Sequence, residues 1–207
     1  MSNFGLIVIG AHTGVWLQKE FEKYKNEKIL LIEPVPHNLD ELKNNISKFK
    51  NIIIEPIAVA ADTLDKKFYF VKKDSIHKLK KHWASGIGSF NKDHILDHKT
   101  KRFKITEDDI SIINIKCLSI SDLIAKHSIE NIDTLQLDVE GSEYEILNSI
   151  DFNKTNINRI IFESKHFDGT FKEGKKLELI KNKLVENKYK LKQLDEENIL
   201  AEKLPLI

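Results

Sequence analysis

The chain has 207 residues, 41% of them hydrophobic, which suffices for one α/β domain with a sizeable core, and no Pro- or Gly-rich linker divides residues 1–207. A formal net charge of +1 excludes a strong global attraction to nucleic acid or anionic membranes, and a single cysteine excludes an intramolecular disulfide. No apolar segment approaches the ~20 residues that span a bilayer, and no leader-like segment precedes the first apolar run, so we expect a soluble cytoplasmic protein.

The chain opens with two apolar runs, Phe4–Ile9 and Lys28–Ile32, which are typical of strands covered on both faces. The short helix expected between them should turn four side chains inward: Val15, Trp16, Phe21 and Tyr24. Asn38 is a candidate N-cap for the next helix, whose apolar positions recur at helical spacing: Leu39, Leu42, Ile46 and Phe49. Asn51–Ala60 then reads as a third strand. Two β-α units followed by a strand indicate a parallel sheet with right-handed crossovers.

The middle of the chain is less regular. Phe68–Val71 is a candidate added strand, and residues 72–110 have weak periodicity, so we expect an insertion or a long loop there. From Lys72 to Lys104 there are ten Lys/Arg and three Asp. This basic stretch indicates either a solvated face or a surface that attracts an anionic partner. Ile112–Leu118 is the next strand candidate, with a buried Cys117, and Ile120–Ala125 begins a helix.

Regular alternation resumes towards the C-terminus. The pattern predicts a strand at Thr134–Val139, a helix at Glu143–Ile150, a strand at Arg159–Glu163 and a helix at Lys172–Asn187. That last helix should bury Leu177, Ile180, Leu184 and Val185. Two apolar runs then flank a polar turn, which indicates an antiparallel hairpin: Tyr189–Leu194 and Ile199–Leu204. The expected fold is a Rossmann-like, mostly parallel, doubly wound sheet that ends in this hairpin.

A nucleotide-type ligand is indicated at the carboxyl ends of the strands, where ligands of such sheets bind. Gly10 and Gly14 follow the first strand: Gly10 lets the backbone pass close to a ligand, and Gly14 permits tight packing of strand and helix. Glu33 lies 23 residues beyond Gly10, at the end of the second strand, where an acid can accept hydrogen bonds from both ribose hydroxyls. A free ribose diol is common to S-adenosylmethionine and NAD, but the chain lacks the Gly-x-Gly-x-x-Gly pattern typical of NAD sites.

Three motifs together resemble one family. They are, in chain order, Gly10-Ala11-His12-Thr13-Gly14, Glu33-Pro34-Val35-Pro36 with Asn38, and Leu137-Asp138-Val139-Glu140-Gly141-Ser142-Glu143. Their order and spacing are similar to those of the motifs of FkbM-type methyltransferases. The resemblance spans about residues 5–167. It implies a class I methyltransferase fold, S-adenosylmethionine as cofactor, and O-methylation of acceptors that include sugars and polyketide-type metabolites. It further implies cofactor contacts from Gly10, Ala11 and Gly14 at the methionine part, Glu33 at the ribose, and Ala58 and Val59 near the adenine, and we add His12 and Pro34 to this set. Asp138 ends the strand expected beside the first one, so its side chain can face the sulfonium.

Carboxylates near the ends of two later strands are candidates for the reacting half of the site. We expect Asp138, Glu140, Glu163 and His166 to be catalytic, because removal of a hydroxyl proton by a positioned base typically adds ~10²–10⁴ in rate. The alternative is structural: Asp138 would accept backbone hydrogen bonds, and Glu143 would stabilise the N-terminus of the following helix.

The acceptor is expected at the Gly/Ser segment Trp83–Phe90, with Trp83, Ser85, Ser89 and Lys165 as candidate contacts. The neighbouring basic stretch favours a small-molecule or glycan acceptor that carries phosphate or carboxylate. We predict no metal site. Asp138, Glu140 and Glu163 are a conceivable set of oxygen ligands for magnesium. His94-x-x-x-His98 can share a helix face, but no Glu or Cys stands nearby at a supporting spacing.

Two other functions remain open. The basic stretch 72–104 also suits an RNA methyltransferase, with Trp83, Phe90 and Phe103 as the aromatic residues available for stacking on bases. The second open function is that of a non-catalytic relative that only binds S-adenosylmethionine or a nucleotide. Val8 motivates this reading, since it stands where the family usually has Asp. A homo-oligomer is compatible with either reading.

Overall fold

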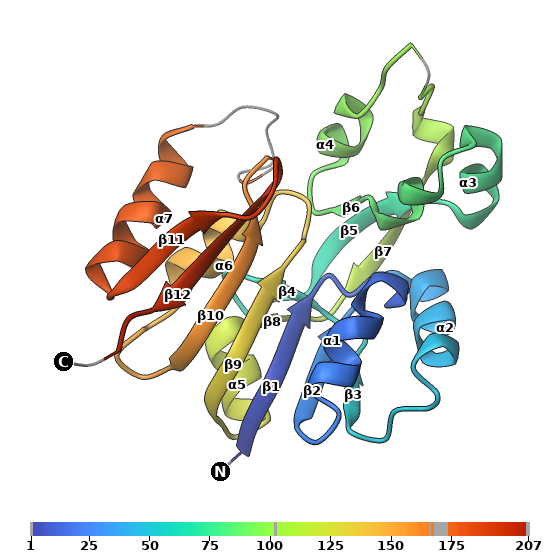
Figure 1. Cartoon of the computed structure of the whole chain (residues 1–207). Helices are drawn as coiled ribbons and strands as arrows, with labels where there is room; N and C mark the ends of the chain where they lie inside the picture. The colour runs from blue at the N-terminus through green and yellow to red at the C-terminus, as the bar shows by residue number, and fades with distance from the viewer. Residues whose placement is uncertain (1, 102, 166, 168–173, 206–207) are drawn as a thin grey trace.

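A seven-stranded sheet forms the centre of the computed structural model, which describes residues 2–101, 103–165, 167 and 174–205 (Figure 1). Its strand order is β11-β12-β10-β9-β1-β2-β3. The strands are β1 (Ser2–Ile9), β2 (Lys28–Ile32), β3 (Ile52–Glu55), β9 (Ile129–Leu137), β10 (Asn156–Glu163), β11 (Tyr189–Gln193) and β12 (Asn198–Lys203). Neighbours from β10 to β3 pair in parallel, whereas β12 pairs antiparallel with both β10 and β11. The predicted Rossmann-like sheet with a terminal hairpin is therefore confirmed.

The direction of winding reverses between β1 and β9. From β1 the chain adds β2 and β3 on one side, and it later adds β9 and β10 on the other. Ile9 of β1 pairs with Leu137 of β9 at the carboxyl edge. Since the connections leave these two strands in opposite directions, a crevice opens at this edge, and it is the usual ligand position in such sheets.

Helices cover both faces of the sheet. One face carries η1 (Val15–Leu17), α1 (Gln18–Lys23) and α2 (Pro36–Asn45), and the other carries α5 (Ile120–Lys126), α6 (Glu143–Ser149) and α7 (Lys175–Glu186). Side chains alternate along β1, so that Ile7 and Ile9 pack in the core beneath α5 and α6, while Leu6 and Val8 pack beneath α1 and α2. Within the residues described, no helix is long and apolar enough to cross a bilayer.

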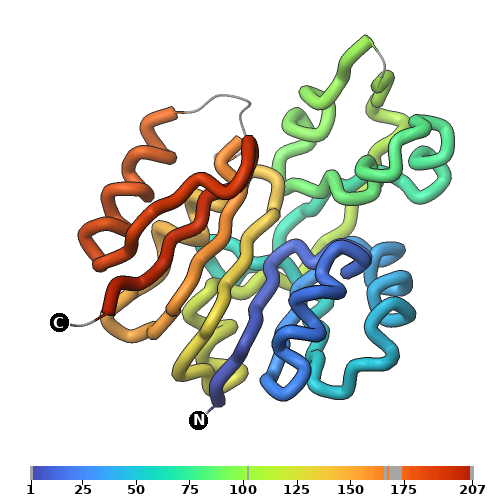
Figure 2. Tube along the Cα trace, in the orientation of Figure 1, coloured from blue at the N-terminus to red at the C-terminus, as the bar shows by residue number. Residues whose placement is uncertain are grey.

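A smaller unit stands beyond the carboxyl edge of the sheet (green in Figures 1 and 2). Its three-stranded antiparallel sheet has the order β6-β5-β7. The elements of this added unit are β5 (Lys66–Val71), α3 (Lys73–Leu79), η2 (His82–Gly86), β6 (Gly88–Ser89), α4 (Lys92–Asp97), η3 (Glu107–Asp109) and β7 (Ile110–Ile115). A parallel pair, β4 (Ala58–Ala60) and β8 (Cys117–Ser119), forms its base. Residues 72–110, expected as an insertion or long loop, thus contain helices and a strand.

Two predicted strands are each divided in two. Asn51–Ala60 splits into β3 and β4, because Pro56 has no N–H to donate to a sheet partner. Ile112–Leu118 is likewise divided at Lys116, between β7 in the added unit and β8 at its base. These splits transfer the chain from the main sheet to the added unit and back.

Four predictions of side-chain position were wrong. Val15, Trp16 and Val185 are exposed, and Leu17 takes the inward position of the 3-10 turn because that turn shifts the helical phase. Asn38 is not the N-cap: Val35 occupies that position, and Asn38 lies inside α2, where its amide bonds Glu33 and the Ser85 carbonyl. The remaining predicted core positions of α7 are buried: Leu177, Ile180 and Leu184.

The hydroxyl group of Tyr24, at the end of α1, forms hydrogen bonds to side chains of β9 and β10. The Tyr24 hydroxyl donates to Asp133 Oδ2 at 2.6 Å and accepts from Arg159 Nη2 at 2.5 Å. Thr134 Oγ1 lies 2.9 Å from the same oxygen. Arg159 Nη2 also pairs directly with Asp133 Oδ2 at 2.6 Å, so the buried Tyr24 hydroxyl adds a third member to an existing ion pair.

Tyr24→Phe should lower the free energy of unfolding by about 1–2 kcal/mol, because it removes the hydrogen bonds that the buried hydroxyl makes to Asp133, Arg159 and Thr134. Urea denaturation would measure the loss. Tyr69→Phe, at a half-buried tyrosine of β5, is the control and should stay within about 0.5 kcal/mol of wild type. Equal stability of the two variants would contradict this role for Tyr24.

Candidate functional site

Three connected hollows occupy the crevice at the carboxyl edge. The inner pocket has mostly apolar walls and three acids, Glu33, Asp138 and Glu140. The rest of its lining includes Ile32, Pro34, Ala58, Val59, Phe68 and Phe90. The middle pocket is lined by His12, Trp16, Trp83 and Gly86 together with Gly10 and Glu33. The outer pocket is lined by Trp83, His98, Glu163, Lys165, Glu197 and Asn198. Asp138 and Glu140 line all three hollows, so these two acids stand where the hollows meet.

The turn after β1 requires glycine at position 10. Gly10 has φ +90°, and a Cβ there would lie 1.8 Å from the carbonyl oxygen of Asp138. The Asp138 N–H donates to the Ile9 carbonyl at 3.0 Å, which holds the end of β9 against this turn. The sequence predicted that Gly10 admits a ligand. The structure gives it a second purpose, which is to let the two strand ends approach each other.

Glu33 fastens the turn after β1 to the turn after β2. Its Oε2 accepts from the His12 N–H at 2.8 Å, and its Oε1 accepts from the Val35 N–H at 2.9 Å and from the Asn38 amide at 3.3 Å. Burial of the side chain raises its pKa to about 7, although these three hydrogen bonds oppose the shift. A carboxylate offers about four lone-pair positions, so one remains for a hydroxyl in the inner pocket.

His12 occupies a left-handed conformation with φ +51°. His is among the non-glycine residues that tolerate this region best. The His12 Nε2 lies 2.7 Å from Ser85 Oγ of η2, so the turn after β1 also contacts the added unit. Burial lowers the pKa of His12, which favours the neutral ring.

Glu143 holds the loop that presents Asp138 and Glu140. This side chain is fully buried and accepts from the Val139 N–H at 2.7 Å and the Gly141 N–H at 2.9 Å. Burial, with the neighbouring Glu163 and Asp138 carboxylates adding to it, raises the pKa of Glu143 well above its ordinary value. The loop needs this support, because Glu140 and Gly141 both have positive φ, +56° and +106°.

The structure brings most of the predicted cofactor residues together. Gly10, Glu33, Pro34, Ala58, Val59 and Asp138 line the inner pocket, and His12 lines the middle one. Ala11 and Gly14 line none of the three hollows. Ala11 is packed in the core beneath α1 and α2, and a Cβ on Gly14 would lie 2.6 Å from the Leu42 side chain. Their small size therefore serves packing of the turn.

The predicted reacting residues gather less completely. Asp138, Glu140, Glu163, Lys165 and Trp83 share the outer pocket, whereas His166 lies outside the described residues. Ser85 is turned to His12, and the buried Ser89 lies 3.4 Å from the Glu140 carbonyl; neither lines these hollows.

Sequence reasoning missed Glu197 and Asn198, which belong to the polar turn and the start of β12 and also line the outer pocket. Glu197 pairs with Lys165. The polar turn gave only a hairpin signal, and nothing in that pattern indicates that the turn reaches the crevice.

Comparisons with known proteins give one matching family and several similar folds. A sequence profile of the FkbM methyltransferase domain matches residues 9–191. The structure is similar to a Methanococcus jannaschii fibrillarin pre-rRNA processing protein, with a TM-score of 0.50 and 13% identity, over 98% of this chain and 66% of that one. A precorrin-6y C5,15-methyltransferase from Geobacter metallireducens has a TM-score of 0.47 and 11% identity, over 98% and 82%. A comparison with curated proteins found no match.

The doubly wound sheet, the terminal hairpin and a crevice at the point of reversal define a class I methyltransferase fold. The profile match covers most of the chain, and the chain belongs to the FkbM methyltransferase family. The family prediction is thus confirmed.

Gly10→Ala should cost at least about 2–3 kcal/mol of stability, because the new methyl would overlap a backbone oxygen that cannot move away. Gly86→Ala is a matched control at the mouth of the same crevice, since a Cβ there meets no atom within 4 Å. Thermal and urea unfolding of both variants would measure the difference. A Gly10→Ala protein as stable as the control would refute the close approach.

The raised pKa of Glu33 makes stability depend on pH. The folded chain keeps this proton up to about pH 7, whereas the unfolded chain loses it near its ordinary value of 4.5. Stability contributed by this group should therefore fall as pH rises through that window, by at most about 1.4 kcal/mol per pH unit. Urea unfolding from pH 5 to 8 should show a shallower fall for Glu33→Gln, and parallel profiles would contradict the buried acid.

Proposed function

We propose that this chain is an S-adenosylmethionine-dependent O-methyltransferase that acts on a hydroxyl group of a small, anionic acceptor such as an acidic or phosphorylated sugar. One observation carries the proposal: Asp138 and Glu140 border both an adenosine-like inner pocket and an outer pocket of acceptor size and polarity. Membership of the FkbM methyltransferase family supports the transferase chemistry.

The inner pocket suits an adenosyl group. Apolar side chains of Ile32, Val59 and Phe90 can enclose an adenine ring, and the remaining position on the Glu33 carboxyl group can form a hydrogen bond with a ribose hydroxyl. The opening towards His12 and Asp138 leads to the middle pocket, where the methionine part would extend. S-adenosylmethionine supplies, when bound, a methyl group already activated on a sulfonium.

The chain's own contribution is alignment and removal of a proton. Transfer requires the acceptor oxygen to approach the methyl carbon in line, at about 3–3.5 Å. Asp138 and Glu163 border the outer pocket from the ends of adjacent strands, so either carboxylate can take the hydroxyl proton. Lys165 adds a positive charge to the same pocket, which favours an acceptor with phosphate or carboxylate.

The non-catalytic alternative loses one of its grounds. Val8 is fully buried in the core beneath α1 and α2 and lines none of the three hollows, so in this chain the position faces away from the crevice. Calorimetry with S-adenosylmethionine should give micromolar-range binding. A protein with no detectable affinity would overturn the proposal.

Asp138→Asn should retain cofactor binding but reduce turnover by about 10²–10⁴-fold, because the amide cannot accept the proton. Release of S-adenosylhomocysteine would be measured with a panel of sugars, sugar phosphates and uronic acids. Asp65→Asn, at an exposed acid before β5, is the matched control. Turnover that survives in Asp138→Asn would move the base to another residue.

The charge of the acceptor can be tested on three lysines of the basic stretch 72–104: Lys80, Lys81 and Lys101. Replacing all three with Glu should raise KM for an anionic acceptor and should change KM for a neutral sugar far less. Equal effects on both acceptors would remove the role of charge.

RNA is the second candidate acceptor, and the same basic stretch is what favours it. Single-strand readers place exposed aromatic residues along a positive groove. Phe103 is buried and Phe90 half-buried, so of the three aromatic residues in the stretch only Trp83 is exposed. Salt-sensitive binding of single-stranded RNA in a gel-shift assay would favour this candidate over a sugar.

A further inference from the structure

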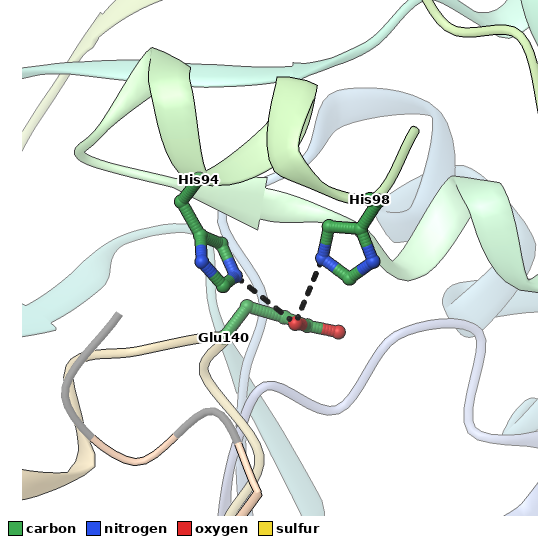
Figure 3. Close-up of side chains that lie close together, drawn as sticks. All are labelled: His94, His98 and Glu140. Carbon is green, nitrogen blue, oxygen red and sulfur yellow. Dashed lines mark hydrogen bonds and ion pairs between the residues drawn. The ribbon is translucent and has the colours of Figure 1, made fainter. Parts of the chain in front are cut away.

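Two histidines and one glutamate converge beside the outer pocket. His94 lies on α4, and His98 follows its last turn, so the two rings share one side of the helix (Figure 3). Glu140 reaches them from the loop after β9 (Figure 3). The His94 Nε2 lies 3.4 Å from Glu140 Oε2, and the His98 Nε2 lies 3.6 Å from the same oxygen. One ligand atom from each residue lies within 4.8 Å of the others.

These separations match those between atoms bound to one metal ion, and they exceed the about 2.7–2.9 Å of a charge-assisted hydrogen bond to a carboxylate. Donors bound to zinc at ~2.0–2.1 Å in a tetrahedron lie about 3.3–3.4 Å apart. Two of the three separations, 3.4 and 3.6 Å, are close to that value, and the third is within 4.8 Å.

The surroundings also suit a metal ion. His94 is fully buried, and the His98 and Glu140 side chains are 9% and 19% exposed, so the cluster is largely shielded from bulk water. Two imidazoles with one carboxylate are a ligand set typical of zinc and related divalent ions in sites that keep a coordination position open. His98 and Glu140 also line the outer pocket, so the open side faces that pocket.

We propose that His94, His98 and Glu140 bind one divalent transition-metal ion, such as Zn²⁺, at the wall of the outer pocket. The ion would join α4 of the added unit to the loop after β9, and it would hold the two walls of the crevice together. Binding itself does not depend on the proposed function. One consequence rests on it: an oxygen of the acceptor would complete the coordination and so be positioned beside Asp138.

Only half of this site could be predicted from the sequence. The spacing of His94 and His98 indicated a shared helix face, but the third ligand is 42 residues beyond His98 and belongs to the motif expected to be catalytic. Folding of the added unit over the carboxyl edge brings them together.

The experiment uses the full chain, stripped with a chelator and dialysed. Titration calorimetry with Zn²⁺, and the visible absorption of added Co²⁺, should each show one ion per chain. His98→Gln and Glu140→Gln should each weaken binding at least about tenfold, because even outer-sphere partners of a metal are worth that much. His77→Gln removes an exposed histidine from α3 of the same added unit and should bind as wild type.

The outcomes separate cleanly. Failure of the wild-type chain to bind stoichiometric Zn²⁺ or Co²⁺ would overturn the site, and so would unchanged affinity in both ligand variants. Far-UV circular dichroism would check that each variant is folded. If Glu140→Gln does not fold, the affinity of His98→Gln alone decides the test. Calorimetry with S-adenosylmethionine on the same samples tests the proposed function separately. Metal binding without cofactor affinity would preserve this site while refuting that function.

Discussion

The shape of the crevice depends on the carboxyl group of Glu143, which lines none of the three hollows. Glu143 lies at the start of α6, fully buried, and accepts from two backbone N–H groups of the loop that it follows. A loop with two consecutive residues at positive φ is costly, and it persists only where the surrounding structure holds it. By binding that loop, Glu143 fixes where Asp138 and Glu140 stand, and so fixes the junction of all three hollows.

Glu33 performs the same operation on the other side of the crevice. It gathers the backbone N–H groups of His12 and Val35, which belong to the turns after β1 and β2. Glu33 thus joins the turns after β1 and β2, and Glu143 holds the loop after β9. The pKa of each of these acids is raised because burial disfavours the charged form. The walls of the site are therefore set before any ligand arrives, and the binding free energy need not order them.

The sequence predicted the fold well because periodicity is strong in the sheet core. Lys28–Ile32 matches β2, and the terminal hairpin forms where apolar runs flank the polar turn. Prediction failed where tertiary context decides. A run of apolar residues does not reveal that Pro56 divides it between two sheets, and helical spacing from Val15 does not reveal a 3-10 turn.

The candidate site was predictable only in part, for a similar reason. Residues at strand ends are placed by topology, which is why Gly10, Glu33 and Asp138 could be brought together in advance. Contacts made by the added unit and by the hairpin turn are not placed by the strand order alone. The bond from His12 to Ser85, the contribution of Glu197 and the approach of His94 to Glu140 all depend on how one substructure lies over another.

The pairing of β4 with β8 has a consequence for how this architecture can diversify. Ala58 lies beside Cys117, so the chain leaves for the added unit and returns from it at neighbouring points. An excursion that begins and ends at one place can lengthen or shorten at little cost in loop-closure entropy. Changes in that excursion would leave the register of the main sheet intact. The walls that the added unit contributes to the crevice, Trp83 and His98 among them, can therefore change without any change in the main sheet.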